Sequence, residues 1–149
     1  LDILFQGSIG NDVFNATRIE TEGMFSVANA SADVLDRWQN PGDITRIPRA
    51  VFSDPDQNSR ISSRFIEDGS FVKLRNVTLS YRLPKSLLEQ MKLQTLAFWF
   101  SGQNLLTFTN YKGYDPEVNR DGGSAISQGI DYGTYPQSRI YTGGVRVEF

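Results

Sequence analysis

Three stretches of this chain alternate apolar and polar side chains residue by residue, and that alternation constrains the fold more than any other feature. A period of two is the geometry of a β-strand, in which successive side chains point to opposite faces. The apolar positions are Val77, Leu79 and Tyr81 in the first stretch, Leu96, Phe98 and Phe100 in the second, and Tyr141, Gly143, Val145, Val147 and Phe149 in the third. Leu1, Ile3 and Phe5 show a partial form of the pattern, and Trp99 breaks it by lying on the polar side of its stretch. We therefore expect strands that each have one apolar and one polar face.

The connections between the expected strands are unequal in length. Strands are expected at residues 1–9, 70–83, 94–108 and 139–149, with a short turn at 84–92 and long loops at 10–64 and 109–138. In the short turn Pro84 ends the strand, and Ser86 and Glu89 have the spacing of a capping box that opens about one helical turn. In the first long loop Ser31 is placed to cap a short helix. Strands joined in this way form an all-β, antiparallel, up-and-down arrangement.

The apolar faces of these strands need a cover. A soluble sheet buries its apolar face under a second layer, and apart from the short helix we find no such layer in the sequence. The longest apolar run, residues 96–100, is far shorter than the roughly 20 residues of a spanning helix. A membrane barrel strand needs only about 9–11 residues with one apolar face. Long loops at one end, short turns at the other and an outward apolar band are typical of an outer-membrane β-barrel.

Composition argues against most other functions. The chain has no Cys and no His, which excludes disulfides, thiolate or imidazole metal sites and a serine–histidine catalytic pair. Fifteen Lys and Arg against 17 Asp and Glu give a formal charge of −2, so no basic excess is present to grip nucleic acid. The neighbouring carboxylates Glu67–Asp68 and Asp115/Glu117 lie in loops beside glycine, where solvated ions are the rule. We expect no enzyme activity.

Two loops have oxygen spacings that resemble a calcium site. Residues 54–58 begin like a calcium loop, but Ser59 stands where that motif requires Gly and Phe65 where it requires Glu. In the second loop, side-chain oxygens alternate along the chain beside two glycines: Asp115, Glu117, Asn119 and Asp121, followed by Gly122 and Gly123. That spacing is compatible with a hard cation, but a solvated acidic loop is the favoured interpretation. We expect no metal and no cofactor.

Several motifs resemble one known family. They are RFIEDGSFVKLRNVTLSY at 64–81, GQNL at 102–105, YKGYDPE at 111–117, YPQSR at 135–139 and a terminal Phe149, preceded by GSIGNDVFNATR at 7–18. In this order they look like the C-terminal region of SusC/RagA-type TonB-dependent outer-membrane transporters, and they cover nearly the whole chain. The resemblance implies that residues 1–149 form the last four strands of a transmembrane barrel of about 22 strands. The plug domain and the upstream strands would precede residue 1.

The family resemblance also implies a function and partners. It implies active import of glycan oligomers or peptides across the bacterial outer membrane, energised through TonB, which would contact the absent N-terminal region. A SusD-like surface lipoprotein would sit over the barrel as a lid. The aromatic Phe149 would be read by the barrel-assembly machinery and would also anchor its strand at the lipid interface.

The candidate site residues fall into two groups. Candidates for contact with a ligand or with the lid are Tyr111, Tyr114, Asp115, Tyr132, Tyr135 and Trp38; candidates for contact with lipid or for assembly are Tyr141, Val145, Val147 and Phe149. Aromatic faces with a polar tip suit sugar rings and peptide side chains. Alternatively, the tyrosines pack the loop on itself or stack on a partner protein.

A second interpretation of the whole chain is a soluble, secreted β-domain that binds carbohydrate through its tyrosine-rich loop. It requires a β-sandwich in which two apolar faces are buried against each other. One face is that of Val77, Leu79 and Tyr81, and the other is that of Val145, Val147 and Phe149.

Overall fold

The structure, a computed structural model, describes residues 1–121 and 126–149. The chain divides into two compact units, which we treat separately. The strand unit comprises Leu1–Ile9, Ser70–Asn110 and Pro136–Phe149, and the loop unit comprises Gly10–Gly69 and Tyr111–Tyr135. No helix within the described ranges is long and apolar enough to cross a membrane.

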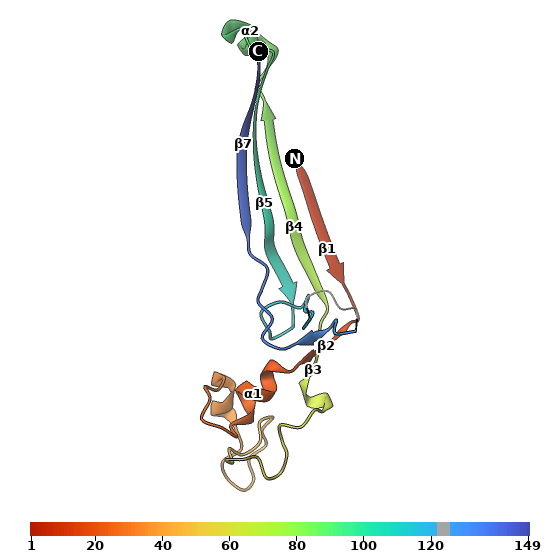
Figure 1. The fold of residues 1–149 in the computed structure, drawn as a ribbon, viewed down its shortest axis with the longest axis vertical. Coiled ribbons are helices and arrows are strands. Elements are labelled where there is room, and N and C mark those ends of the chain that lie inside the picture. The colour runs from red at the N-terminus through yellow and green to blue at the C-terminus, as the bar shows by residue number, and fades with distance from the viewer. Residues whose placement is uncertain (122–125) are drawn as a thin grey trace. The chain divides into compact units, whose positions relative to one another are not determined.

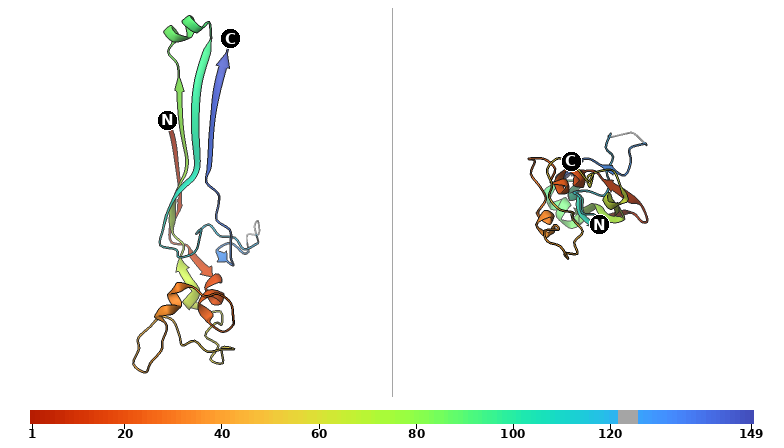
Figure 2. Two further views of the ribbon diagram at one scale, coloured as in Figure 1. Left: turned by 90° about the vertical axis from the view of Figure 1, so that its left-hand side faces the viewer. Right: turned by 90° about the horizontal axis from the view of Figure 1, so that it is seen from below.

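The strand unit is one antiparallel sheet. Its strands are β1 (Asp2–Ser8), β4 (Phe71–Arg82), β5 (Thr95–Thr109) and β7 (Ile140–Glu148). They lie side by side in the order β1-β4-β5-β7, and every neighbouring pair is antiparallel (Figures 1 and 2). Each observed strand end lies one residue from the end expected from the sequence. The expectation of an all-β, antiparallel fold is confirmed.

A short helix, α2 (Lys85–Met91), connects β4 to β5. Its N-cap is Pro84, and no side chain caps the helix, so Ser86 and Glu89 lie inside α2 and the expected capping box is wrong. The physical reason is that the fixed φ of proline, −66° here, already sets the chain for a helix that starts at the next residue. Lys92 ends α2 in the left-handed conformation, with φ of 58°.

The register of the sheet places the alternating apolar residues on one face. Leu79 pairs with Phe100, and Phe100 pairs with Gly143. Two residues away along β5, Phe98 pairs with Val145. Because directly paired residues point to the same side, these side chains share a face. The two faces that the sandwich interpretation buries against each other are therefore neighbours on one sheet. This arrangement contradicts the sandwich.

Trp99 lies on the polar face, and the structure explains this exception. Trp99 pairs with Gly144 on β7, and its indole ring covers that glycine so closely that a Cβ there would lie 2.6 Å from the indole nitrogen. An aromatic side chain that packs across a glycine shields the exposed backbone of the neighbouring strand. The pair Trp99–Gly144 thus locks the register between β5 and β7.

A β-bulge in β4 reverses the alternation. On the β1 side, Leu4 pairs with Asn76 but Phe5 pairs with Leu74, so Arg75 has no opposite residue. A bulge adds one residue to one strand and turns every later side chain to the other face. Beyond Arg75 the apolar face therefore continues through Leu74 and Val72, while Lys73 points to the polar face.

The Arg75 side chain fixes this bulge. Its guanidinium donates to the amide oxygens of Gln6 at 2.8 Å, Asn104 at 3.0 Å and Gln137 at 2.8 Å. These partners come from β1, β5 and the segment before β7. Asn104 lies at a second irregularity, on β5, with a φ of 52°. Arg75 therefore holds adjacent strands together where their ladders are interrupted.

The long loops contain more structure than the sequence indicated. In the loop unit β2 (Asp12–Asn15) pairs antiparallel with β3 (Ile66–Asp68) and parallel with β6 (Ile130–Asp131). Helix α1 (Thr17–Gly23) follows β2, and short 3-10 turns span Ala32–Asp36 and Ser63–Phe65. Ser31 caps the first of these turns, accepting from the Asp33 amide at 3.2 Å. Because β6 belongs to the second long loop, this sheet ties the two loops together.

Candidate functional site

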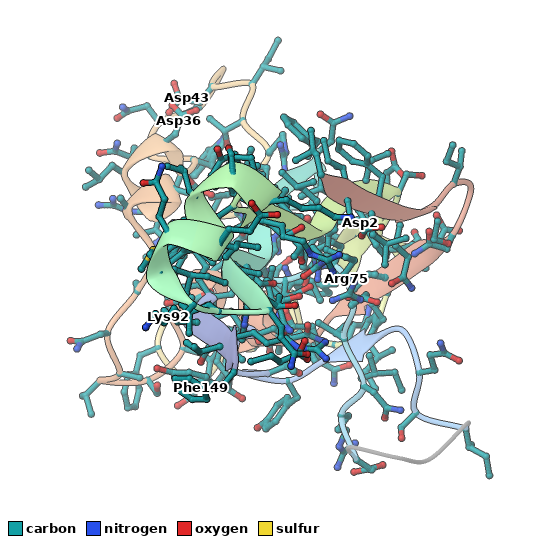
Figure 3. The ribbon with its side chains drawn as sticks, turned by 90° about the horizontal axis from the view of Figure 1, so that it is seen from above. Asp2, Asp36, Asp43, Arg75, Lys92 and Phe149 are labelled. Atoms are coloured by element: carbon teal, nitrogen blue, oxygen red, sulfur yellow. The ribbon has the colours of Figure 1, made fainter. Side chains whose placement is uncertain are left out.

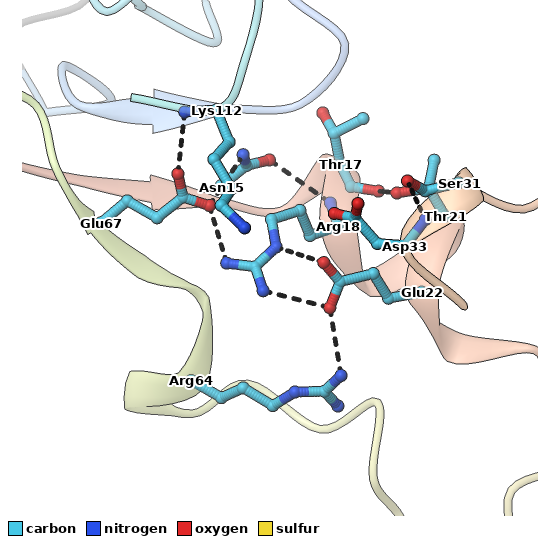
Figure 4. Close-up of polar contacts among 10 residues, drawn as sticks. All are labelled: Asn15, Thr17, Arg18, Thr21, Glu22, Ser31, Asp33, Arg64, Glu67 and Lys112. Carbon is cyan, nitrogen blue, oxygen red and sulfur yellow. Dashed lines mark hydrogen bonds and ion pairs between the residues drawn. The ribbon is translucent and has the colours of Figure 1, made fainter. Parts of the chain in front are cut away.

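A buried cluster of ions lies at the centre of the loop unit (Figure 4). Arg18 of α1 makes a bidentate contact with Glu22, with nitrogen–oxygen distances of 2.6 and 3.1 Å. The third guanidinium nitrogen of Arg18 lies 2.7 Å from Glu67 of β3, and Arg64 lies 3.1 Å from Glu22. Two cations and two anions thus balance within one cluster. We call Arg18, Glu22, Arg64 and Glu67 the ion cluster.

Local sequence explains how the ion cluster forms. Arg18 and Glu22 are four residues apart, so they lie on the same face of α1. Both are buried, and Phe65 lies beneath the guanidinium groups of Arg18 and Arg64 at 5.9 and 5.1 Å from its ring centre. Burial lowers the pKa of Arg18, but its contacts with Glu22 and Glu67 outweigh burial and raise that pKa. Arg18 is therefore held in its charged form.

Glu67 extends the ion cluster to the second long loop. Its Oε2 accepts from the backbone amide of Lys112 at 3.0 Å, and its Oε1 accepts from the Asn15 side chain at 3.3 Å. Next to Lys112, the Tyr111 hydroxyl donates to Asp131 at 2.5 Å. Glu67 thus links β3 to the second long loop through a hydrogen bond to a charged acceptor, whereas the buried Tyr111–Asp131 hydrogen bond lies within that loop.

Beside the ion cluster lies a cavity of about 430 Å³. It is lined by Asn15, Thr17, Arg18, Thr21, Glu22, Asn29, Ala30, Ser31, Asp33, Lys112, Gly113, Tyr114 and Asp131. The lining combines hydroxyl, amide, carboxylate and ammonium groups with the aromatic ring of Tyr114. Figure 4 shows the side chains that α1, the Ser31–Asp33 segment and Lys112 contribute. Such a set of groups is suited to a polar oligomer with hydroxyl or amide functions.

The structure separates the candidate tyrosines. Tyr111 is 6% exposed and packs with Val13 and Val118 in the core of the loop unit, as in the alternative in which the loop packs on itself. Tyr114 and Tyr135 are 82% and 87% exposed. Tyr132 is exposed on one side, with the Arg120 guanidinium 5.8 Å from its ring centre. Only Tyr114 among the exposed tyrosines lines the cavity.

The other two candidates for ligand or lid contact, Asp115 and Trp38, do not line the cavity. Asp115 is buried, and its Oδ1 accepts from the Glu117 amide at 2.9 Å. Trp38 is half-buried, and its backbone amide donates to Ile47 at 2.9 Å, outside the cavity lining. Sequence reasoning missed Arg18, Glu22 and Lys112. The spacing of four between Arg18 and Glu22 was the one available sign.

The candidates for lipid contact share the apolar face of the strand unit. Tyr141, Val145 and Val147 are exposed on β7, and the Tyr141 ring stacks on Phe100 with 6.2 Å between ring centres. Phe149 is exposed at the end of the chain. A row of exposed apolar side chains on a continuous sheet face is what a lipid-facing surface requires.

In the two calcium-like loops, side-chain oxygens accept hydrogen bonds from residues of the same loop. In the first, the Asp54 carboxylate accepts from the amides of Asn58 and Ser59, both at 2.8 Å, and from the Ser59 hydroxyl. In the second, the Asn119 side-chain oxygen accepts from the Ser127 hydroxyl at 3.1 Å. Gly122 and Gly123 lie outside the described residues. Within residues 1–121 and 126–149, no group of three or more ligating side chains is placed to hold a metal.

Acidification is expected to loosen the Asp54 loop. Burial raises the pKa of Asp54, but the hydrogen bonds from Ser59 and Asn58 outweigh it and lower that pKa. The carboxylate therefore stabilises the loop above its unfolded pKa of about 4, and the stabilisation disappears as pH falls through the lower folded value. Hydrogen-exchange protection of the Asn58 and Ser59 amides should fall below about pH 4. In Asp54→Asn protection should be low at neutral pH and insensitive to acid; unchanged protection would contradict this role.

Replacing Tyr111 with phenylalanine is expected to destabilise the loop unit by about 1–3 kcal/mol. The substitution removes the hydroxyl that donates to buried Asp131 and leaves a carboxylate oxygen without that donor. Hydrogen exchange of the β6 amides measures the effect. Tyr132→Phe is the matched control, because the Tyr132 side chain is exposed. Equal protection in the two variants would show that the hydroxyl contributes nothing.

Comparisons with known proteins identify the chain. No family model matches the sequence. TonB-dependent receptor P3 of Formosa agariphila is 39% identical over all of this chain and 15% of its own length. TonB-dependent receptor SusC of Bacteroides thetaiotaomicron is 26% identical over 97% of this chain and 13% of its own length. The RagAB peptide importer in its "open-open" state matches with a TM-score of 0.79 and 27% identity, over 99% of this chain and 15% of that one.

The chain is a SusC/RagA-type segment. It is thus part of a TonB-dependent receptor of the bacterial outer membrane, and the resemblance seen in its motifs is confirmed. The relatives are receptors and importers, and they agree with the expectation that the chain is not an enzyme. This SusC/RagA-type segment spans about 15% of the length of its relatives.

Proposed function

We propose that this SusC/RagA-type segment forms part of the wall and mouth of an importer of glycan oligomers or peptides. The importer works with a SusD-like surface lipoprotein and is energised through TonB. The observation that carries the proposal is the sheet β1-β4-β5-β7, which keeps one apolar and one polar face through its bulge. The short turn at α2 lies on the periplasmic side and the long loops on the extracellular side, as in other outer-membrane barrels.

The length of the apolar face supports a position in the membrane. On β5 the apolar side chains run from Leu96 to Phe108, which corresponds to about 40 Å along a strand at about 3.3 Å per residue. A barrel strand is tilted by about 35–45°, so this length spans about 30 Å, the thickness of the hydrocarbon core. The apolar face is therefore matched to lipid.

The opposite face supports an aqueous lumen. Asn76, Thr78 and Ser101 are linked by hydrogen bonds of 3.0–3.1 Å across β4 and β5. Arg146 and Glu148 form an exposed ion pair on the same face of β7. Hydroxyl, amide and charged groups line the water-filled interior of such barrels.

Exposed apolar residues in the loop unit support contact with a partner protein. The segment between α1 and β3 carries large apolar side chains that are mostly or fully exposed: Val27, Leu35, Ile44, Phe52 and Ile61. Isolated exposed apolar side chains are common, but several on one segment indicate a surface that another protein covers. A SusD-like lipoprotein is the partner that we propose for it.

The cavity beside the ion cluster supports ligand contact at the mouth. Tyr114 offers an exposed aromatic face, and Asn29, Asp33 and Lys112 offer hydrogen-bonding groups around it. Aromatic rings with polar neighbours bind both sugar rings and peptide side chains. The soluble carbohydrate-binding module needs a sandwich that this sheet does not form.

Uptake by cells that carry the full-length receptor tests the proposal. Tyr114→Ala should raise the apparent KM for uptake about fivefold, since an exposed aromatic contact contributes about 1 kcal/mol. A casein peptide digest and maltodextrins are suitable probes of the two ligand classes. Tyr135→Ala is the matched control, because Tyr135 is equally exposed but lies outside the cavity lining. If the Tyr114→Ala variant took up a transported probe as well as the native receptor does, the cavity would not contact the ligand.

A further inference from the structure

The connection between β4 and β5 has an exposed apolar strip. Leu87 and Met91 are four residues apart, so they lie on the same face of α2, and they are 45% and 52% exposed. Leu88, in contrast, is 5% exposed and fixes the helix to the rest of the unit. A surface turn that only had to reverse the chain would not need two large apolar side chains there.

Lysines flank this strip at both ends. Lys85 is the first residue of α2 and Lys92 follows its last, and both are exposed. An apolar strip bounded by lysines is the pattern of a helix that lies flat in a membrane interface. The apolar side chains then enter the boundary of the acyl chains, and the ammonium groups reach the lipid phosphates.

Lys92 stands where glycine is usual. Its φ of 58° is left-handed, and its amide donates to Glu89 and Leu88 carbonyls as the helix ends. Glycine is the residue that adopts this conformation without strain. Compared with glycine, lysine at position 92 places a positive charge at the end of α2 but strains the backbone.

The strip lies at the same end of the sheet as two exposed aromatic residues of the apolar face. Tyr81, near the end of β4, and Phe149, at the end of the chain, are exposed on the apolar face at the same end of the sheet as α2. The Gln94 amide, two residues beyond Lys92, donates to the Glu148 carbonyl at 2.8 Å and so brings Phe149 to this end. Figures 1 and 3 show the C-terminus and α2 together. Aromatic residues of this kind mark the border between hydrocarbon and headgroups.

We propose that α2 is an interfacial anchor that binds phospholipid headgroups of the periplasmic leaflet. Leu87 and Met91 enter the acyl boundary, while Lys85 and Lys92 contact phosphate oxygens. The proposal rests on the proposed function, because it needs the apolar sheet face to be in lipid with α2 on the periplasmic side.

Single cysteine probes in the full-length receptor test this anchor, since the chain described here has no cysteine. Fluorophores at Leu87→Cys and Met91→Cys, in phosphatidylethanolamine–phosphatidylglycerol vesicles, should lie about 5–10 Å below the headgroups by quenching with nitroxide lipids. Glu89→Cys is the control on the opposite side of α2, and its probe should be quenched from water. Equal access of water-soluble quencher to all three probes would overturn the proposal.

A second set of variants separates the effect of the Lys92 charge from the effect of its backbone conformation. Lys92→Arg should keep the depth of the Met91→Cys probe, whereas Lys92→Gly, which relieves the backbone, should make that probe shallower. Equal depth in both variants would show that the Lys92 side chain does not hold α2 at the membrane.

A probe at Phe98→Cys on β5 distinguishes failure of the anchor from failure of the proposed function. If the Phe98 probe lies in the hydrocarbon while the α2 probes are in water, only the anchor fails; if the Phe98 probe is also in water, the proposed function fails.

Discussion

Replacing Leu79 with arginine is expected to destabilise the membrane-inserted receptor by about 2–4 kcal/mol. Leu79 is exposed on the apolar face of β4 opposite Phe100. Under the proposed function the substitution puts a guanidinium into hydrocarbon. The cost comes from loss of hydration, which no neighbour on that face replaces. Equilibrium unfolding of the full-length receptor by guanidinium chloride, in phospholipid vesicles, measures the change.

The adjacent residue provides the matched control for Leu79. Ser80 is exposed on the polar face and pairs with Trp99, so Ser80→Arg places the same charge toward the aqueous side. Its free energy of unfolding should change by less than about 1 kcal/mol. The prediction therefore concerns a difference between neighbours. If both variants lost the same stability, the apolar face would not be the one in contact with lipid.

Replacing Arg18 with methionine is expected to cost about 3–5 kcal/mol of local stability in the loop unit. Methionine keeps much of the side-chain volume but removes the charge, leaving Glu22 and Glu67 buried without their main cation. Arg64 compensates only in part, because its contact is with Glu22. Hydrogen exchange of the α1 and β3 amides in the full-length receptor should report the loss, with the strand unit unchanged.

Arg120 supplies the comparison for Arg18. It lies 3.8 Å from Asp121 in an ion pair whose two side chains are each 59% exposed. An exposed pair contributes at most about 1 kcal/mol, so Arg120→Met should leave exchange in α1 and β3 as it is in the native protein. The double substitution of Glu22 and Glu67 by glutamine should recover part of the stability lost in Arg18→Met. Failure of this rescue would mean that the loss came from packing on Phe65 and not from unpaired charge.

The strands were predictable because their pattern is local. Alternation around Leu79, Phe98 and Val145 specifies both the strand and the face that each side chain takes, whatever the partner strand is. The bulge at Arg75 was not predictable in this way. It depends on how β1 and β5 pair with β4, and the alternation on either side of Arg75 gives two incompatible assignments of the apolar face.

The candidate site was predicted less well, for a related reason. Tyr111 and Tyr114 are three residues apart in one motif, and the sequence treats them alike. The structure buries Tyr111 against Val13 and Asp131 and leaves Tyr114 exposed beside the cavity. Which tyrosine is buried depends on where β2 and β6 meet, and those strands come from different loops.

The sequence by itself determined the strands, their apolar face, the long loops and the SusC/RagA-type family, because each follows from residue order over short distances. The tertiary structure decided which loop residues are buried, how Arg75 turns β4, and how Arg18 gathers Glu22 and Glu67. Those features depend on pairing between segments that are far apart in the chain. A buried ion is stable only when its partners arrive from those segments, so no local pattern encodes the cluster.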